Sequence, residues 1–106
     1  MTDLTFKDLE AYLHLKYQKP EHSTSLFMKL VEEIGEVAEV LNQLEGRKAP
    51  NHQNTLENEL VDVIHYAVAI AAVNQIDLSK AIIEKDKVAS VKYHQTPNLE
   101  EFLKQT

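Results

Sequence analysis

Cysteine is absent from this sequence of 106 residues, and glycine and proline are scarce. Without cysteine the chain can form neither disulfides nor thiolate metal sites. The 2 glycines and 3 prolines stand where helices would be interrupted, not at the regularly spaced turns of a strand-rich protein. The predicted fold class is therefore all-α.

Positive charge is also in short supply, since the formal net charge is −6. Proteins that bind nucleic-acid polymers draw their affinity from clustered lysine and arginine, so no such partner is expected. An anionic substrate would need metal ions to approach this chain. Its size and its hydrophobic fraction of 43% suit one domain over residues 1–106.

Neither a secretory leader nor a long hydrophobic run is visible. The longest apolar stretch, Leu60 to Val73, is shorter than the roughly 20 residues that a membrane span needs. We therefore expect a cytoplasmic protein without a membrane partner.

Apolar periodicity and capping residues predict four helices and a short C-terminal turn, a four-to-five-helix bundle. Thr5 and Asp77 are the expected N-caps of the first and fourth helices, and Asn98 with Glu101 forms a capping box at the turn. The expected bounds are about 6–17, 23 or 25 to 44, a start between 51 and 56 continuing to 75, and 78–93. Asn54 and Thr55 are both acceptable caps for the third of these helices.

The third predicted helix is apolar on nearly every side. A short chain cannot easily surround such a helix, so we expect burial in a dimer or tetramer. Gly35, inside the second helix, costs up to roughly 1 kcal/mol against alanine, which suggests that another helix packs closely there.

Two acidic pairs lie at helical spacing, Glu33 with Glu36 and Glu59 with Asp62. Side chains three apart share a helix face, so each pair can converge on one ion. Carboxylates without histidine or cysteine select a hard cation, Mg²⁺ or alternatively Mn²⁺. The alternative is an ordinary solvated acidic face, because glutamate is a good helix former.

Position favours the metal site over that alternative. Glu33 projects toward the apolar stripe of its helix between Val40 and Leu26, and Asp62 has apolar groups beneath it. A buried carboxylate without a partner is costly, so a cation is expected there. Whether the two acidic pairs lie side by side in an antiparallel helix pair depends on where the third helix starts. They lie at the same height if it starts near residue 51, and they are offset by roughly 7 Å if it starts at Leu56.

The segments from Lys29 to Glu39 and from Glu59 to Val63 carry the pattern EExxE…ExxD. This pattern, with similarity over about 25–93, resembles that of MazG-like nucleotide pyrophosphohydrolases. The resemblance implies attack of a metal-activated water on a nucleoside triphosphate, giving a monophosphate and pyrophosphate. It also implies that Mg²⁺ is held by four carboxylates: Glu33, Glu36, Glu59 and Asp62.

Further residues are candidates for catalysis and substrate binding. Glu32 is the candidate general base, or else a further ligand. Lys29, Lys85 and Lys92 are candidates for phosphate contacts, and Lys29 is a candidate for pairing with a carboxylate as well; the alternative is solvated or snorkelling lysines. Ala89 stands where family members often carry asparagine, which leaves one substrate contact unassigned.

Three functions remain open at this point. The leading one is Mg²⁺-dependent hydrolysis of noncanonical or deoxynucleoside triphosphates in nucleotide-pool cleaning. A variant within the same fold is hydrolysis of one pyrimidine deoxynucleotide or of phosphoribosyl-ATP. The third is a helical oligomerisation or metal-binding module without turnover.

Overall fold

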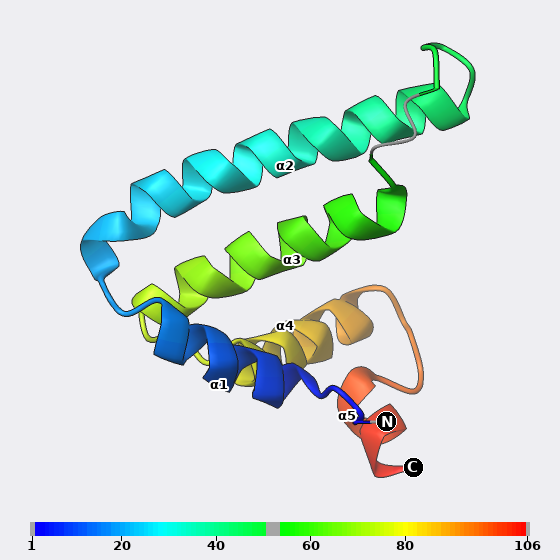
Figure 1. Cartoon of the computed structure of the whole chain (residues 1–106). Helices are drawn as coiled ribbons and strands as arrows, with labels where there is room; N and C mark the ends of the chain where they lie inside the picture. The colour runs from blue at the N-terminus through cyan, green and yellow to red at the C-terminus, as the bar shows by residue number, and fades with distance from the viewer. Residues whose placement is uncertain (1, 51–53, 106) are drawn as a thin grey trace.

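The computed structural model describes residues 2–50 and 54–105, and its regular elements are all helical (Figure 1). This confirms the all-α prediction, with a C-terminal helix where only a turn was expected. In chain order the elements are α1 (Phe6–Lys16), the 3₁₀ helix η1 (Pro20–His22), α2 (Ser23–Leu44), α3 (Leu56–Val73), α4 (Leu78–Lys92) and α5 (Leu99–Lys104).

Helix starts follow the capping residues. The Thr5 and Asp77 side chains accept hydrogen bonds from backbone amides three residues on, and Asn98 and Glu101 form the predicted capping box before α5. Helix α3 begins at Leu56, the later of the two predicted starts, behind the N-cap Thr55. Each cap satisfies a backbone N–H that the first turn leaves unpaired.

Three helix ends carry a residue in the left-handed region. Gly46, Gln75 and His94 have φ values of 80°, 57° and 54°. After α3, this turn lets the Ile76 amide donate to the Ala71 carbonyl at 2.9 Å, the bond that closes a Schellman cap. The turn ends α3 at Val73, before the predicted limit.

Helices α2 and α3 form an antiparallel pair, and α1 packs on the C-terminal half of α3 (Figure 1). Leu26 from α2 meets Ala69 and Val73 from α3 in a buried cluster. Leu13 of α1 is fully buried. Burying a leucine contributes about 1.5–3 kcal/mol, so these contacts fix the pairing that brings the acidic residues of α2 and α3 together.

Helix α4 turns away from α3 by 105° and packs mainly against α5 and α1. A carboxylate holds α4 to each of these two helices: Glu10 of α1 accepts a hydrogen bond from the Leu78 amide at 2.9 Å, and Asp86 of α4 accepts one from the Leu99 amide at 2.6 Å. Within the described residues, no single helix has the length and apolar composition to cross a bilayer; α3 and α4 reach that threshold only as a bent pair.

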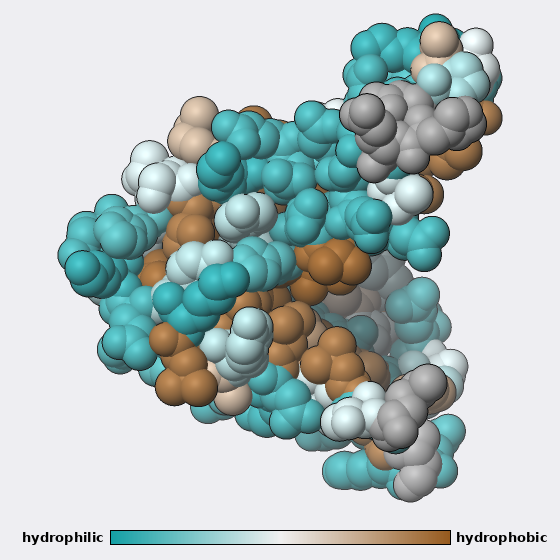
Figure 2. Space-filling model, viewed as in Figure 1, coloured by the Kyte–Doolittle hydropathy of each residue, from teal (hydrophilic) through white to brown (hydrophobic). Residues whose placement is uncertain are grey.

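The direction of α4 leaves one side of α3 uncovered. Leu60, Val61 and Ile64 are 45%, 61% and 49% exposed, and Figure 2 shows apolar surface around α1 and α3. The expectation for Gly35 is wrong within this chain: the residue is exposed, and a Cβ there would meet nothing within 4 Å. The exposed apolar side chains of α3 are the surface that the expected self-association would cover, whereas Gly35 makes no close helix contact in this chain.

Candidate metal centre

Three acidic side chains from two helices converge between α2 and α3. Carboxylate oxygens of Glu33 on α2 and of Glu59 and Asp62 on α3 all lie within 4.8 Å of one another. Glu59 is 7% exposed, while Glu33 and Asp62 are half-buried. We call these three residues the acidic group.

Local sequence explains why these side chains meet. Glu33 projects beside the apolar stripe of α2, and its predicted neighbours Val40 and Leu26 are both buried. Glu59 lies in the first turn of α3, where the helix dipole favours negative charge. Asp62 follows one turn later on the same face, so the antiparallel pairing sets both α3 carboxylates against Glu33.

The acidic group concentrates negative charge, and no ion pair between described residues offsets it. Burial raises the pKa of Glu33 above its ordinary value of 4.5, and the charges of Asp62 and Glu59 raise it further. Among the ion pairs between described residues, none involves Glu33, Glu59 or Asp62. Oxygen donors in this number, crowded and uncompensated, fit a hard divalent cation such as Mg²⁺.

Glu36 lies outside the acidic group. It is exposed, and its Oε2 accepts a hydrogen bond from the Asn54 side-chain amide at 3.3 Å. The offset between the acidic pairs that was expected if α3 started at Leu56 therefore affects only Glu36. This residue lies one turn beyond Glu33, opposite the residues that precede α3. Glu33 still reaches both acids of α3.

The remaining predicted site residues on α2 pair with each other. The ammonium of Lys29 lies 3.4 Å from Glu32 Oε2, and both side chains are exposed. Glu32 adjoins Glu33 in sequence but points to a different side of the helix, as their difference in burial shows. Lys29 therefore contacts a carboxylate, which was one of the partners expected for it.

Lys85 and Lys92, the candidates for phosphate contacts on α4, are not buried in the helical bundle of this chain. Both are exposed, because α4 turns 105° away from α3. The Lys92 ammonium lies 5.3 Å from the ring centre of Tyr93. The structure thus brings together three predicted metal ligands, places Glu36 and Glu32 nearby on α2, and keeps both α4 lysines apart.

Comparison with known sequences is decisive for the family. The sequence model described as "MazG nucleotide pyrophosphohydrolase domain" matches residues 21–94, a range that contains α2, α3, α4 and the whole acidic group. The chain belongs to this family. The resemblance seen in the EExxE…ExxD pattern is thereby confirmed.

Two relatives of this MazG domain illustrate the likeness. The crystal structure of iMazG from Vibrio DAT 722 superposes with a TM-score of 0.67 at 27% sequence identity, over 87% of this chain and 100% of that one. Rat (Rattus norvegicus) dCTP pyrophosphatase 1 is 39% identical over 67 residues, 58% of this chain. The aligned region spans 39% of the rat protein's length.

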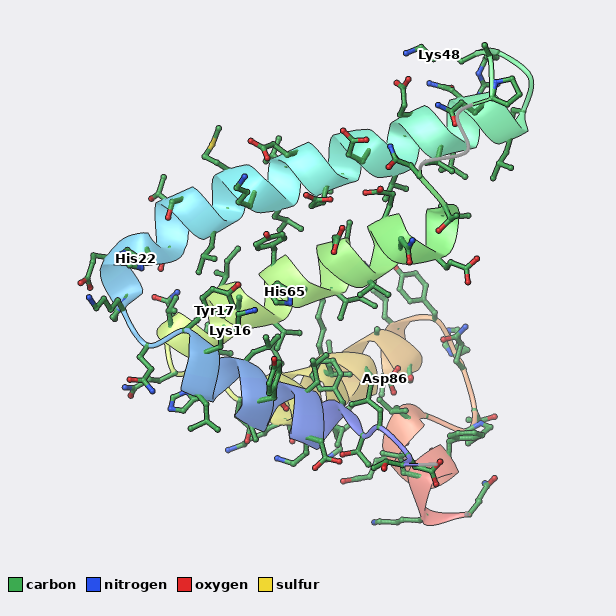
Figure 3. The ribbon with its side chains drawn as sticks, viewed as in Figure 1. Lys16, Tyr17, His22, Lys48, His65 and Asp86 are labelled. Carbon is green, nitrogen blue, oxygen red and sulfur yellow. The ribbon has the colours of Figure 1, made fainter. Side chains whose placement is uncertain are left out.

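A histidine of α3 contacts the tyrosine that ends α1, just before the matched MazG range. Tyr17 and His65 point toward each other between α1 and α3 (Figure 3), and the Tyr17 hydroxyl lies 2.8 Å from His65 Nε2. Burial lowers the pKa of His65 below 6.5, and the charge of Lys16 lowers it further, against a smaller opposing effect of Asp62. His65 is therefore a half-buried histidine with a hydrogen-bonded partner. Tyr66 beside it packs against the buried cluster of Leu26, Ala69 and Val73.

Sequence patterns gave no sign of some contacts that shape the domain. In the sequence Asn54 was notable only as an acceptable helix cap, whereas in the structure its hydrogen bond to Glu36 joins the segment before α3 to α2. Glu10, which caps α4 from α1, has no sequence signal at all. A groove of about 790 Å³ also lies between α1 and the end of α3, on surface that contains none of the acidic group.

Proposed function

We propose that this chain is a Mg²⁺-dependent nucleoside triphosphate pyrophosphohydrolase that releases pyrophosphate and a nucleoside monophosphate. The observation that carries the proposal is the convergence of Glu33, Glu59 and Asp62 oxygens within 4.8 Å, in a domain of the MazG family. Mn²⁺ satisfies the same oxygen donors.

The residues of this chain divide the work. Glu33, Glu59 and Asp62 would hold the cation, with Glu36 as the fourth carboxylate at the rim. When bound, Mg²⁺ lowers the pKa of water and offsets negative charge on the phosphates. The carboxylates are fixed by helix packing, so their charges need little rearrangement during the reaction.

Glu32 is the residue that we assign to take the proton from water. It precedes Glu33 on α2 and is not part of the acidic group, so its carboxylate is available to act as a base. Lys29, 3.4 Å away, offers an ammonium to a phosphate. A Glu32→Gln variant that loses turnover while binding Mn²⁺ as the parent does would separate this role from that of a metal ligand.

The likeness to a protein named dCTP pyrophosphatase 1 supports a deoxynucleoside triphosphate, and in particular a pyrimidine one, as substrate. The test is pyrophosphate release with Mg²⁺ from a panel of ribo- and deoxynucleoside triphosphates, noncanonical nucleotides and phosphoribosyl-ATP. Selective cleavage of dCTP would identify a dedicated pyrimidine enzyme, and broad cleavage would indicate pool cleaning. Failure to cleave any of them would leave a metal-binding or oligomerisation module.

We further propose that the chain works as a dimer or tetramer. Its radius of gyration of 16.7 Å exceeds the roughly 13 Å of a compact domain of about this length, and apolar side chains on α3 are exposed. Assembly would cover them and would let Lys85 and Lys92 of one chain serve the phosphates held by another. Sedimentation showing a stable monomer at micromolar concentration would contradict this proposal.

A further inference from the structure

The loop between α2 and α3 touches the α2 carboxylates at two points of different chemistry. Lys48 places its ammonium 2.7 Å from both oxygens of Glu39. One turn nearer the acidic group, Asn54 donates a single hydrogen bond of 3.3 Å to Glu36 Oε2. The first contact neutralises its carboxylate, whereas the second leaves the charge of Glu36 intact.

We propose that Asn54 is a positioning residue for the metal site: its side-chain amide holds Glu36 Oε2, so that Glu36 Oε1 is presented to a divalent cation bound by Glu33, Glu59 and Asp62. The inference rests on the proposed function, because it concerns the same cation. It adds a residue from outside the EExxE…ExxD pattern.

The position of Asn54 suits this role. It directly precedes Thr55, whose hydroxyl accepts from the Asn58 amide and caps α3, so the residue is tied to the helix that carries Glu59. Glu36 lies one turn from Glu33 on α2. The hydrogen bond between Asn54 and Glu36 therefore joins the two helices at the rim of the acidic group.

The chemistry of the contact points the same way. Carboxylates that bind metals commonly have hydrogen bonds from neighbouring groups that fix their orientation. An exposed glutamate loses rotamer freedom when it binds an ion, and a partner that orders it beforehand lowers that cost. A neutral amide does so without placing positive charge beside an incoming cation, which a lysine in the same place would do.

The experiment compares two loop variants of the full chain by direct metal binding. Asn54→Leu removes the amide at nearly constant size. Lys48→Met removes the other contact of the same loop and is the matched control. Binding of Mn²⁺ is followed by the electron paramagnetic resonance signal of the free ion, and binding of Mg²⁺ by calorimetry, without nucleotide. We expect affinity to fall about tenfold in Asn54→Leu, at the lower end of the range for outer-shell partners, and to stay within about twofold of the parent in Lys48→Met.

A double-mutant cycle then asks whether Asn54 acts through Glu36. In a Glu36→Gln background, Asn54→Leu should have no further effect on Mn²⁺ affinity, because the carboxylate that it positions is gone. Unchanged affinity in Asn54→Leu, equal losses in both loop variants, or additive losses in the double variant would each overturn the assignment. If the parent itself binds no divalent ion, the proposed metal site fails, and this inference fails with it.

Discussion

The acidic group should make the protein less stable when no cation is bound, and Glu33→Gln tests this directly. The substitution keeps the size of the side chain and removes one of three carboxylates whose oxygens lie within 4.8 Å of one another. We therefore expect the metal-free variant to unfold at a higher temperature than the parent, although it has lost a ligand.

The size of the effect follows from Coulomb's law. Two like charges 4.8 Å apart repel by about 0.9 kcal/mol in bulk water and by about 3.5 kcal/mol at the effective dielectric constant of 20 found near protein surfaces. Burial and the charges of Asp62 and Glu59 raise the pKa of Glu33, so Glu33 takes up a proton and the repulsion weakens as pH falls. A gain of about 1–2 kcal/mol near neutral pH is expected, and each kcal/mol corresponds to roughly 4–8 °C in melting temperature for a domain of this size.

Magnesium should reverse the order of the two proteins. At a concentration ten times its dissociation constant, a ligand of the folded state stabilises it by about 1.4 kcal/mol. The parent should gain this amount, and Glu33→Gln should gain little. Glu57→Gln is the matched control, since Glu57 is an exposed acid in the first turn of α3, the helix that carries the other two acids of the group, and it should respond to Mg²⁺ as the parent does.

The assay is thermal unfolding with MgCl₂ or with NaCl at matched ionic strength. General screening acts on all charges, whereas a site requires a divalent ion of suitable size. A metal-free Glu33→Gln less stable than the parent would refute the argument from repulsion. Equal stabilisation of the parent by NaCl and MgCl₂ would refute the site.

Three further predictions concern stability. Gly35→Ala should raise the free energy of unfolding, measured with urea, by about 0.5–1 kcal/mol, and a loss instead would show that a second chain packs there. Because the pKa of His65 is lowered in the folded state, its contribution to stability is present above pH 6.5 and is lost as pH falls below it; His65→Gln should remove this component, and an unchanged pH profile would exclude it. Asp86→Ala removes the acceptor of the Leu99 amide, so hydrogen exchange at Leu99 should accelerate relative to the core of α3, whereas unchanged protection would show that α5 is held otherwise.

Local chemistry made much of this structure predictable. Thr5, Asp77 and Asn98 cap their helices as expected because a cap depends on residues three apart. The apolar period of α2 likewise placed Glu33 next to the core. These predictions need only the geometry of one helix.

Relations between helices were harder to predict. Glu59 is the most buried acid of the group. The pattern of its own helix does not predict this burial, because the residues that cover it belong to α2. The contact of Glu36 with Asn54, and its place outside the acidic group, depend on the residue at which α3 begins. The sequence offered two neighbouring caps, Asn54 and Thr55, and did not decide between them. The direction of α4 is set by the turn at Gln75 and by Glu10 from the distant α1, so the placement of Lys85 could not follow from helix periodicity.

The central claim is that the acidic group supports cleavage of a nucleoside triphosphate between its α- and β-phosphates. Its most direct test is ³¹P NMR of dCTP incubated with Mg²⁺ and the parent, Asp62→Asn, Glu36→Gln or the exposed-acid control Glu57→Gln. The account predicts dCMP and pyrophosphate from the parent and the control, and a rate at least about 100-fold lower for Asp62→Asn and Glu36→Gln, since loss of a charged ligand removes several kcal/mol of stabilisation. Release of dCDP and phosphate, or full activity in Asp62→Asn, would contradict it.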